Sequence, residues 1–251
     1  KVPFYFTTVL DENVYAKSLL ESGRGGLPIY EPVARLVTYL IPISKRRNTR
    51  LKKEVQIISR GTLPQAVECL NLWNSQHQLA AVYTERDFLA PHGLLPAFSL
   101  EHLYAYAWGN RVQGTLGVWN QTSFKQTVVV AYSPVVRATR PLYNIYAGLV
   151  GIPGLPCVKQ EIRSVYAAFV SVDGNNPEVF SSMLEQAATD WASRGYDYLI
   201  VGFCEDNPLK QVAEVAACRS ITSTLYLVYW RGDTIPAIDR KRPFHVEVAT
   251  L

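Results

Sequence analysis

The sequence has little of what builds a metal centre or a disulfide framework. It contains four cysteines and four histidines in 251 residues, and none of them lies at a C-x-x-C, H-x-H or H-E-x-x-H spacing. Four scattered cysteines in a chain of this length do not form a disulfide scaffold, so we expect free, buried thiols. The absence of ligand spacing argues against a structural zinc site, and we expect no metal.

Long apolar runs and strong charge are also missing. The nearest approach to an 18-residue apolar run, residues 142–158, is broken by Asn144, Pro153 and Pro156, so we expect no transmembrane helix. No secretory signal is visible, and the chain does not begin with Met, which suggests a fragment or a processed product. A net charge of +4 is too weak to indicate nucleic-acid binding. We therefore expect a cytoplasmic protein with neither a membrane nor a nucleic acid as its partner.

Three common catalytic motifs are absent as well. The sequence has no G-x-S-x-G elbow, which argues against Ser-His-Asp hydrolysis. It has no Walker loop and no dinucleotide-binding glycine fingerprint. Nucleotide hydrolysis and hydride transfer are therefore not indicated.

The first 44 residues predict a strand, a helix and a second strand. Residues 1–10 are apolar enough for a strand, and Asp11, Glu12 or Asn13 can cap the helix that follows. Gly23 ends that helix, and residues 35–43 form the next strand. Residues 45–53 follow with six basic side chains in nine. They predict either a solvated linker or a contact for an anionic group such as a nucleotide phosphate.

From residue 54 a longer unit begins. We expect strands over residues 55–58, 103–108, 112–119, 126–132, 164–172, 198–203 and 222–230, and a hairpin turn at Gly109-Asn110. Helices are expected over residues 63–74, over 177–194 and from about 208 to 218. The connection over residues 133–160 contains a short amphipathic piece at 142–150, and a connection of this length is usually functional or forms an interface.

The two ends of the chain repeat one pattern. Leu10-Asp11-Glu12-Asn13, followed by a helix and a strand, matches Cys204-Glu205-Asp206-Asn207, also followed by a helix and a strand. The shared acidic-acidic-Asn corner suggests two related units rather than two unrelated strand–helix–strand segments.

One of these segments resembles a known signature. Asn13-x-x-Ala16-x-x-Leu19-Leu20-x-x-Gly23 resembles the second motif of the Gcn5-related N-acetyltransferase (GNAT) superfamily, where an Asn opens the helix after the fifth strand. The order of elements over residues 54–230 is also similar to that family, and Gln113-Gly114-Thr115 resembles its glycine-containing third strand.

The resemblance implies an α/β fold with a mixed, mostly antiparallel central sheet flanked by helices. It divides the chain into residues 1–44, the end of a truncated first unit; residues 45–53, a basic linker; and residues 54–251, a second and more complete unit. It also implies acetyl-CoA or another acyl-CoA as co-substrate. The cofactor-binding residues that it implies are Asn13, Val172, Gly174, Asn175, Asn176 and Asn207.

The sequence departs from the family at its strongest signature. In relatives, glycines at a helix N-terminus expose backbone N–H groups to the pyrophosphate of the cofactor. The best match here is Asn176-Pro177-Glu178, in which both glycines are lost, Pro177 lacks an N–H group and Glu178 adds a negative charge. The cofactor site of the second unit is therefore expected to be degenerate. A turn of amides at Gly174, Asn175 and Asn176 is an alternative anion site.

No catalytic residue can be named from the sequence. Leu20 and Glu214 stand where relatives often carry a tyrosine acid, and Asp173 is explained equally well by a helix-entry turn. The resemblance favours an acyl-CoA-dependent N-acyltransferase, most simply an acetyltransferase, with a small-molecule or peptide amine as acceptor. One alternative is an inactive GNAT-like binding module with residues 133–160 as its surface. A weaker one is an aminoacyl-transfer enzyme that uses the basic linker. A homo-oligomer is expected if a strand edge is left open.

Overall fold

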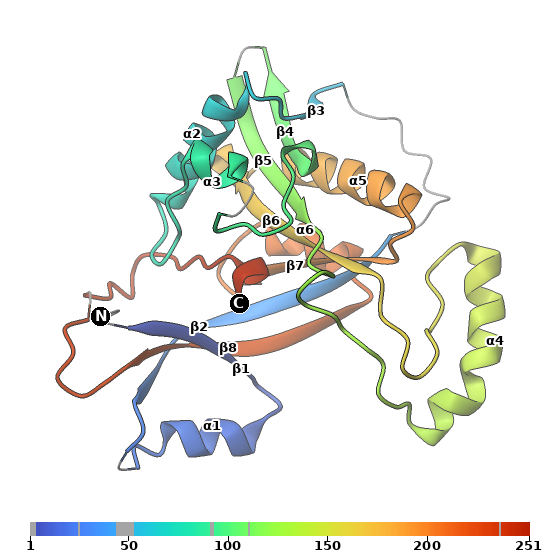
Figure 1. Ribbon diagram of the computed structural model, residues 1–251, viewed down its shortest axis with the longest axis horizontal. Helices are drawn as coiled ribbons and strands as arrows, with labels where there is room; N and C mark the ends of the chain where they lie inside the picture. Colours follow the sequence, from blue (N-terminus) through green and yellow to red (C-terminus); the bar gives the residue numbers. More distant parts are fainter. Residues whose placement is uncertain (1–3, 25, 44–52, 91–92, 110, 236) are drawn as a thin grey trace.

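An eight-stranded sheet passes through the middle of the molecule, with helices on both of its faces (Figure 1). The computed structural model describes residues 4–24, 26–43, 53–90, 93–109, 111–235 and 237–251. The strands are β1 (Tyr5–Leu10), β2 (Ile29–Pro42), β3 (Val55–Ile57), β4 (Leu103–Trp108), β5 (Arg111–Trp119), β6 (Ser164–Val172), β7 (Tyr198–Cys204) and β8 (Arg219–Tyr229). Their order across the sheet is β1-β8-β2-β7-β6-β5-β4-β3.

The described residues contain six α-helices. They are α1 (Val14–Glu21), α2 (Leu63–Asn74), α3 (Glu85–Leu89), α4 (Pro134–Val150), α5 (Pro177–Ser193) and α6 (Lys210–Ala216). Among the strand pairs of these residues only β6 and β7 run parallel; the others are antiparallel. The expected mixed, mostly antiparallel sheet flanked by helices is confirmed.

Two hydrophobic clusters fix the sheet between its helices. The apolar stripe of α5, which includes Phe180, Met183 and Trp191, is fully buried against one face. On the other face, α2 and α3 pack over Phe169 and Trp119. Asn176 begins α5 as the sequence predicts, because its side chain accepts a hydrogen bond from the Glu178 N–H at 2.9 Å.

Residues 1–44 contribute two strands to this same sheet. β2 lies between β7 and β8 and pairs with both, whereas β1 continues the sheet beyond β8. β8 therefore lies between β1 and β2, and β2 lies between β7 and β8. The division into units at 44 and 54 stays a prediction, and residues 45–52 of the basic linker lie outside the described residues.

The repeated corners make the same backbone hydrogen bonds. The N–H of Asp11 donates to the carbonyl of Thr222 at 3.0 Å, and the N–H of Glu205 donates to that of Arg35 at 2.9 Å. Asp11, which follows β1, thus bonds to β8, and Glu205, which follows β7, bonds to β2. The two asparagines also correspond: the Asn13 and Asn207 side chains each accept a backbone N–H of the helix entry that follows.

Several local expectations are wrong. Residues 126–132 do not form a strand, because Val128 makes only an isolated bridge to Glu161. The helix expected at 142–150 begins eight residues earlier, where Ser133 caps it, Pro134 occupies its first turn, and Pro141 is tolerated inside it. Cys157 and Cys218 are exposed, so buried thiols hold for Cys204 but not for these two. Asn110 of the predicted hairpin turn lies outside the described residues.

Candidate functional site

The two parallel strands separate soon after they begin. β6 and β7 pair only at Ser164–Tyr198, Val165–Leu199 and Tyr166–Ile200, although both strands continue for several residues. Beyond these three pairs, backbone groups of both strands face an opening in the sheet. Any such group must bond to something other than a neighbouring strand.

A distortion of β6 lies within the opening. Phe169 has a φ of 54°, and the pairing of β6 with β5 shifts register between Thr115 and Gly117. The Phe169 ring is fully buried against an aromatic cluster, and Gly117 leaves room for it, since a Cβ there would lie 2.6 Å from the ring. This packing holds the bulge in place and determines where the Phe169 N–H points.

The C-terminal segment, residues 244–251, fills one side of the opening. Phe244 bridges to Gln78, and the N–H of His245 donates to the carbonyl of Gln78 at 2.9 Å. Val248 lies against Gly202 of β7 so closely that a Cβ at Gly202 would overlap it. The segment therefore stands over both separated strands.

Glu247 of this segment reaches the bulge. Its Oε2 accepts a hydrogen bond from the Phe169 N–H at 2.7 Å. Burial raises the pKa of the carboxyl to about 7, although the amides of Phe169 and Ala249 act in the opposite direction. A carboxyl with this pKa is partly ionised at neutral pH and can exchange a proton with a bound group.

Two imidazoles, one of them from this segment, pack against an indole. The Trp73 ring lies 4.0 Å from His77 and 4.8 Å from His245, measured between centroids. Burial, with His77 nearby, lowers the pKa of His245 to about 3, so its ring is neutral. The cluster supports the C-terminal segment without adding charge to the opening.

A cavity of about 600 Å³ lies on the opposite face, between α5 and α6. Its walls include the apolar side chains of Ile41, Leu184 and Val212. Glu178 and Glu185 also line it. The cavity suits an apolar or amide-bearing chain, whereas its acidic residues are unfavourable for a phosphate.

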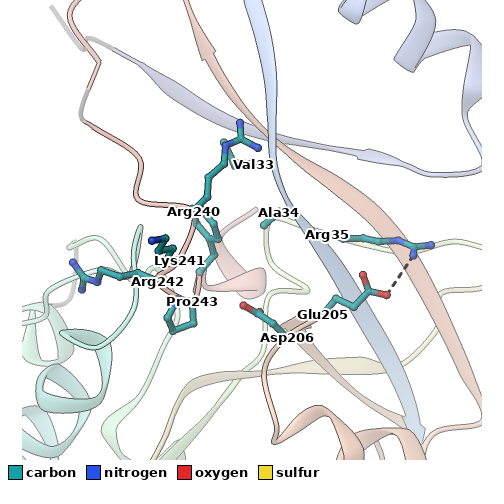
Figure 2. A pocket seen from close by; sticks show the side chains of 10 residues that line it. Val33, Ala34, Arg35, Glu205, Asp206, Arg240, Lys241, Arg242 and Pro243 are labelled. Atoms are coloured by element: carbon teal, nitrogen blue, oxygen red, sulfur yellow. Dashed lines mark hydrogen bonds and ion pairs between the residues drawn. The ribbon is translucent and has the colours of Figure 1, made fainter.

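A second cavity, of about 510 Å³, lies where β7 ends and β2 is bulged (Figure 2). Arg35 reaches Glu205 at 3.3 Å and Asp11 at 2.9 Å, so its charge is compensated. Figure 2 shows Arg240 and Arg242 pointing away from Glu205. The two carboxyls that line this cavity, Glu205 and Asp206, are exposed.

The predicted cofactor residues do not all come together. Val172, Gly174, Asn175 and Asn176 follow one another at the end of β6, and Asn207 follows the end of β7, which borders the same opening. Asn13 follows β1 instead, and β8 and β2 lie between β1 and β7.

The polar groups of the β6 end already have partners. The Asn175 Oδ1 accepts from the Trp73 Nε1–H at 3.0 Å, and Asn176 caps α5. Asp173 forms an ion pair with Arg111 at 2.9 Å. Asn207 accepts from the Leu209 N–H with its Oδ1, whereas its buried Nδ2 has no hydrogen-bond partner among the described residues.

Glu247 and Phe169 could not be found from the sequence. Glu247 lies in a tail without periodicity, and Phe169 sits in an apolar strand like any other core residue. A register shift and a tertiary contact bring them together, and neither leaves a local sequence signal.

Comparisons with solved structures show the fold. A GCN5-related N-acetyltransferase from Sphaerobacter thermophilus superposes with a TM-score of 0.56 at 10% identity, over 94% of this chain and 62% of that one. N-myristoyltransferase of Saccharomyces cerevisiae with bound myristoyl-CoA gives 0.47 at 10% identity, over 80% and 52%. A GNAT-family acetyltransferase from Colwellia psychrerythraea gives 0.43 at 10% identity, over 90% and 65%. The first of these supports a GNAT-like fold.

The chain covers 62% of the length of the Sphaerobacter protein and 49–52% of the length of the yeast N-myristoyltransferase. No protein-family model and no curated protein sequence matches it. No helix of the described residues is long and apolar enough to cross a membrane, and these residues hold no cluster of three metal-ligating side chains.

Proposed function

We propose that this chain carries the acyl-transfer site of an acyl-CoA-dependent N-acyltransferase, most simply an acetyltransferase. The observation that carries the proposal is the opening between β6 and β7, in which the Phe169 amide and the Glu247 carboxyl meet. A backbone donor and a carboxyl of raised pKa are the two groups that amine acylation needs. The GNAT-like fold supports this interpretation.

The roles follow from the chemistry of the two groups. A bound acyl-CoA supplies an acyl thioester. The Phe169 N–H is suited to orient the acyl oxygen. Glu247 is suited to accept the proton that the amine loses as its nitrogen bonds to the acyl carbon, while the carbon–sulfur bond breaks and CoA would leave as a thiolate. Because its pKa is about 7, Glu247 supplies the basic form at neutral pH. For Phe169 to contact the acyl group, Glu247 must release its N–H.

The residues fit one part of acyl-CoA and not another. The cavity between α5 and α6 suits the apolar and amide-bearing arm of the molecule. The start of α5 does not suit the phosphates of acyl-CoA. Pro177 has no N–H group, and the Glu178 N–H already donates to the Asn176 side chain. The carboxylate of Glu178 is also negatively charged. We assign no phosphate contact to α5; Val172, Gly174 and Asn175 stay proposed contacts of the cofactor arm.

Calorimetric titration of acetyl-CoA, with free CoA and desulfo-CoA as comparators, tests binding. We expect micromolar affinity, about −8 kcal/mol. In an amine screen, Glu247→Gln should bind acetyl-CoA as the parent does but lose at least about 100-fold in transfer rate, as expected for a lost general base. The control Glu68→Gln alters an exposed carboxyl of α2 and should retain activity. Equal activity of the Glu247 variant would contradict the assignment.

An inactive binding module is the second candidate. The occupied Phe169 amide and the unfavourable start of α5 favour it. If no CoA species releases heat or raises the melting temperature, this candidate replaces the first.

We also propose that residues 1–44 are the end of a first unit related to the second. The support is the strand order β1-β8-β2-β7 and the matching bonds of the Asp11 and Glu205 corners. Exchange of one strand between two related units produces this order.

A further inference from the structure

The connection between β5 and β6 carries a helix that turns its apolar side outward. Residues 120–163 form this connection, which we call the arm. Arg140 and Asn144 of α4 both donate to the Leu155 carbonyl at 3.1 Å, and the Leu155 N–H returns a bond to Asn144 at 2.7 Å. The polar side of α4 therefore rests on the arm's own returning segment.

The opposite side of α4 is an uncovered apolar stripe. Leu142, Ile145 and Leu149 are 71%, 64% and 69% exposed, and Val135 and Tyr146 extend the same side. Their spacing of three and four residues places them in one row along the helix. Figure 1 shows α4 standing apart from the sheet at the end of two extended connections. An apolar row of this length exposed to solvent marks an interaction surface.

The arm carries a net positive charge. Residues 120–163 contain five basic side chains and one acidic side chain, Glu161. The five are Lys125, Arg137, Arg140, Lys159 and Arg163. The net charge of the arm is therefore +4.

We propose that the arm binds the surface of an anionic lipid bilayer, with the α4 stripe at the boundary of headgroups and acyl chains. An exposed apolar stripe on a segment of net positive charge has the chemistry of such helices. A second copy of the chain is a poorer partner, because two arms of the same sign repel each other. A convex helix of about 25 Å also enters a fluid interface without a matching groove. The inference is independent of acyl transfer.

Co-sedimentation of the full chain with vesicles tests this. We expect binding to vesicles of phosphatidylcholine with 30% phosphatidylglycerol, about tenfold weaker binding to phosphatidylcholine alone, and weakening by salt, as for anionic-lipid association. Leu142→Glu with Ile145→Glu should abolish binding and leave the circular dichroism unchanged, since both side chains are exposed. Val215→Glu on α6, where Val215 is 90% exposed, is the matched control and should bind normally.

Three results would overturn the proposal. They are no sedimentation with anionic vesicles, equal binding to neutral ones, and equal binding by the Leu142–Ile145 variant. Analytical ultracentrifugation without lipid completes the test. If the stripe instead drives dimer formation that the double variant abolishes, and vesicles do not bind, the occupant is a second copy. If neither occurs, an acidic protein groove replaces the bilayer.

Discussion

Glu247 shows how a single residue takes its properties from its surroundings. Nothing beside it in the sequence distinguishes it from the other acidic side chains of the chain. In the folded protein Glu247 is half-buried beside the Phe169 amide, and burial raises its pKa from 4.5 to about 7. The same shift that makes it a candidate base also links folding to pH.

The sign of this linkage is fixed by the direction of the shift. Because the folded pKa is above the unfolded one, the folded state binds the proton more tightly between about pH 4.5 and 7. The contribution of Glu247 is complete below pH 4.5 and is lost as the pH rises through 7, by about 3 kcal/mol. Urea denaturation from pH 4.5 to 8 should therefore show a fall in unfolding free energy that Glu247→Gln removes and Glu68→Gln retains. The same fall in both variants would refute the burial of this carboxyl.

At the scale of elements, the sequence predicted the helices that begin with a capping residue, but it did not predict the contacts of the C-terminal segment. Asn176 with Pro177 begins α5 and Gly195 follows its end, so propensity and capping alone placed it. Residues 126–132 have the composition of a strand but lack a neighbour, because β6 pairs with β5 and β7 instead. The C-terminal segment lies over the opening between β6 and β7 only because Gly202 leaves space for Val248.

This contact predicts the effect of one added methyl group. Gly202→Ala should destabilise the protein by about 1–3 kcal/mol, because the new Cβ overlaps Val248 and displaces the tail. Val248→Ala in the same chain should recover part of the loss. Thermal and urea denaturation of the single and double variants measure both effects. Simple addition of the two single effects would show that the side chains do not interact.

At the scale of the molecule, the sheet combines the two ends of the chain. β2 pairs with β7 over residues 36–42 and with β8 over residues 29–40. Removing it would expose two strand edges in the middle of the sheet, which favours aggregation. β1 and β2 are thus held in the sheet by β7 and β8.

Cleavage of the chain between the two segments tests this interdependence. With a specific protease site inserted within residues 45–53, we expect the two fragments to co-elute in gel filtration after cutting and to unfold in one transition. A chain starting at residue 54 should lose cooperative unfolding, because β7 and β8 then lack their common neighbour. Separate elution of folded fragments would instead favour two independent units.

The sequence by itself determined the helix α5 and the echo of the two acidic-acidic-Asn corners, because capping, periodicity and short spacing are local properties. Its resemblance to the GNAT motifs indicated the class of fold. It also showed where the sequence departs from the GNAT phosphate-loop signature, since both glycines are missing and Pro177 is present. Only the tertiary structure decided that β2 lies between β7 and β8, that Glu247 meets Phe169, and that α4 turns its apolar side outward. Each of these depends on contacts between residues far apart in the chain, whose pairing the local pattern does not specify.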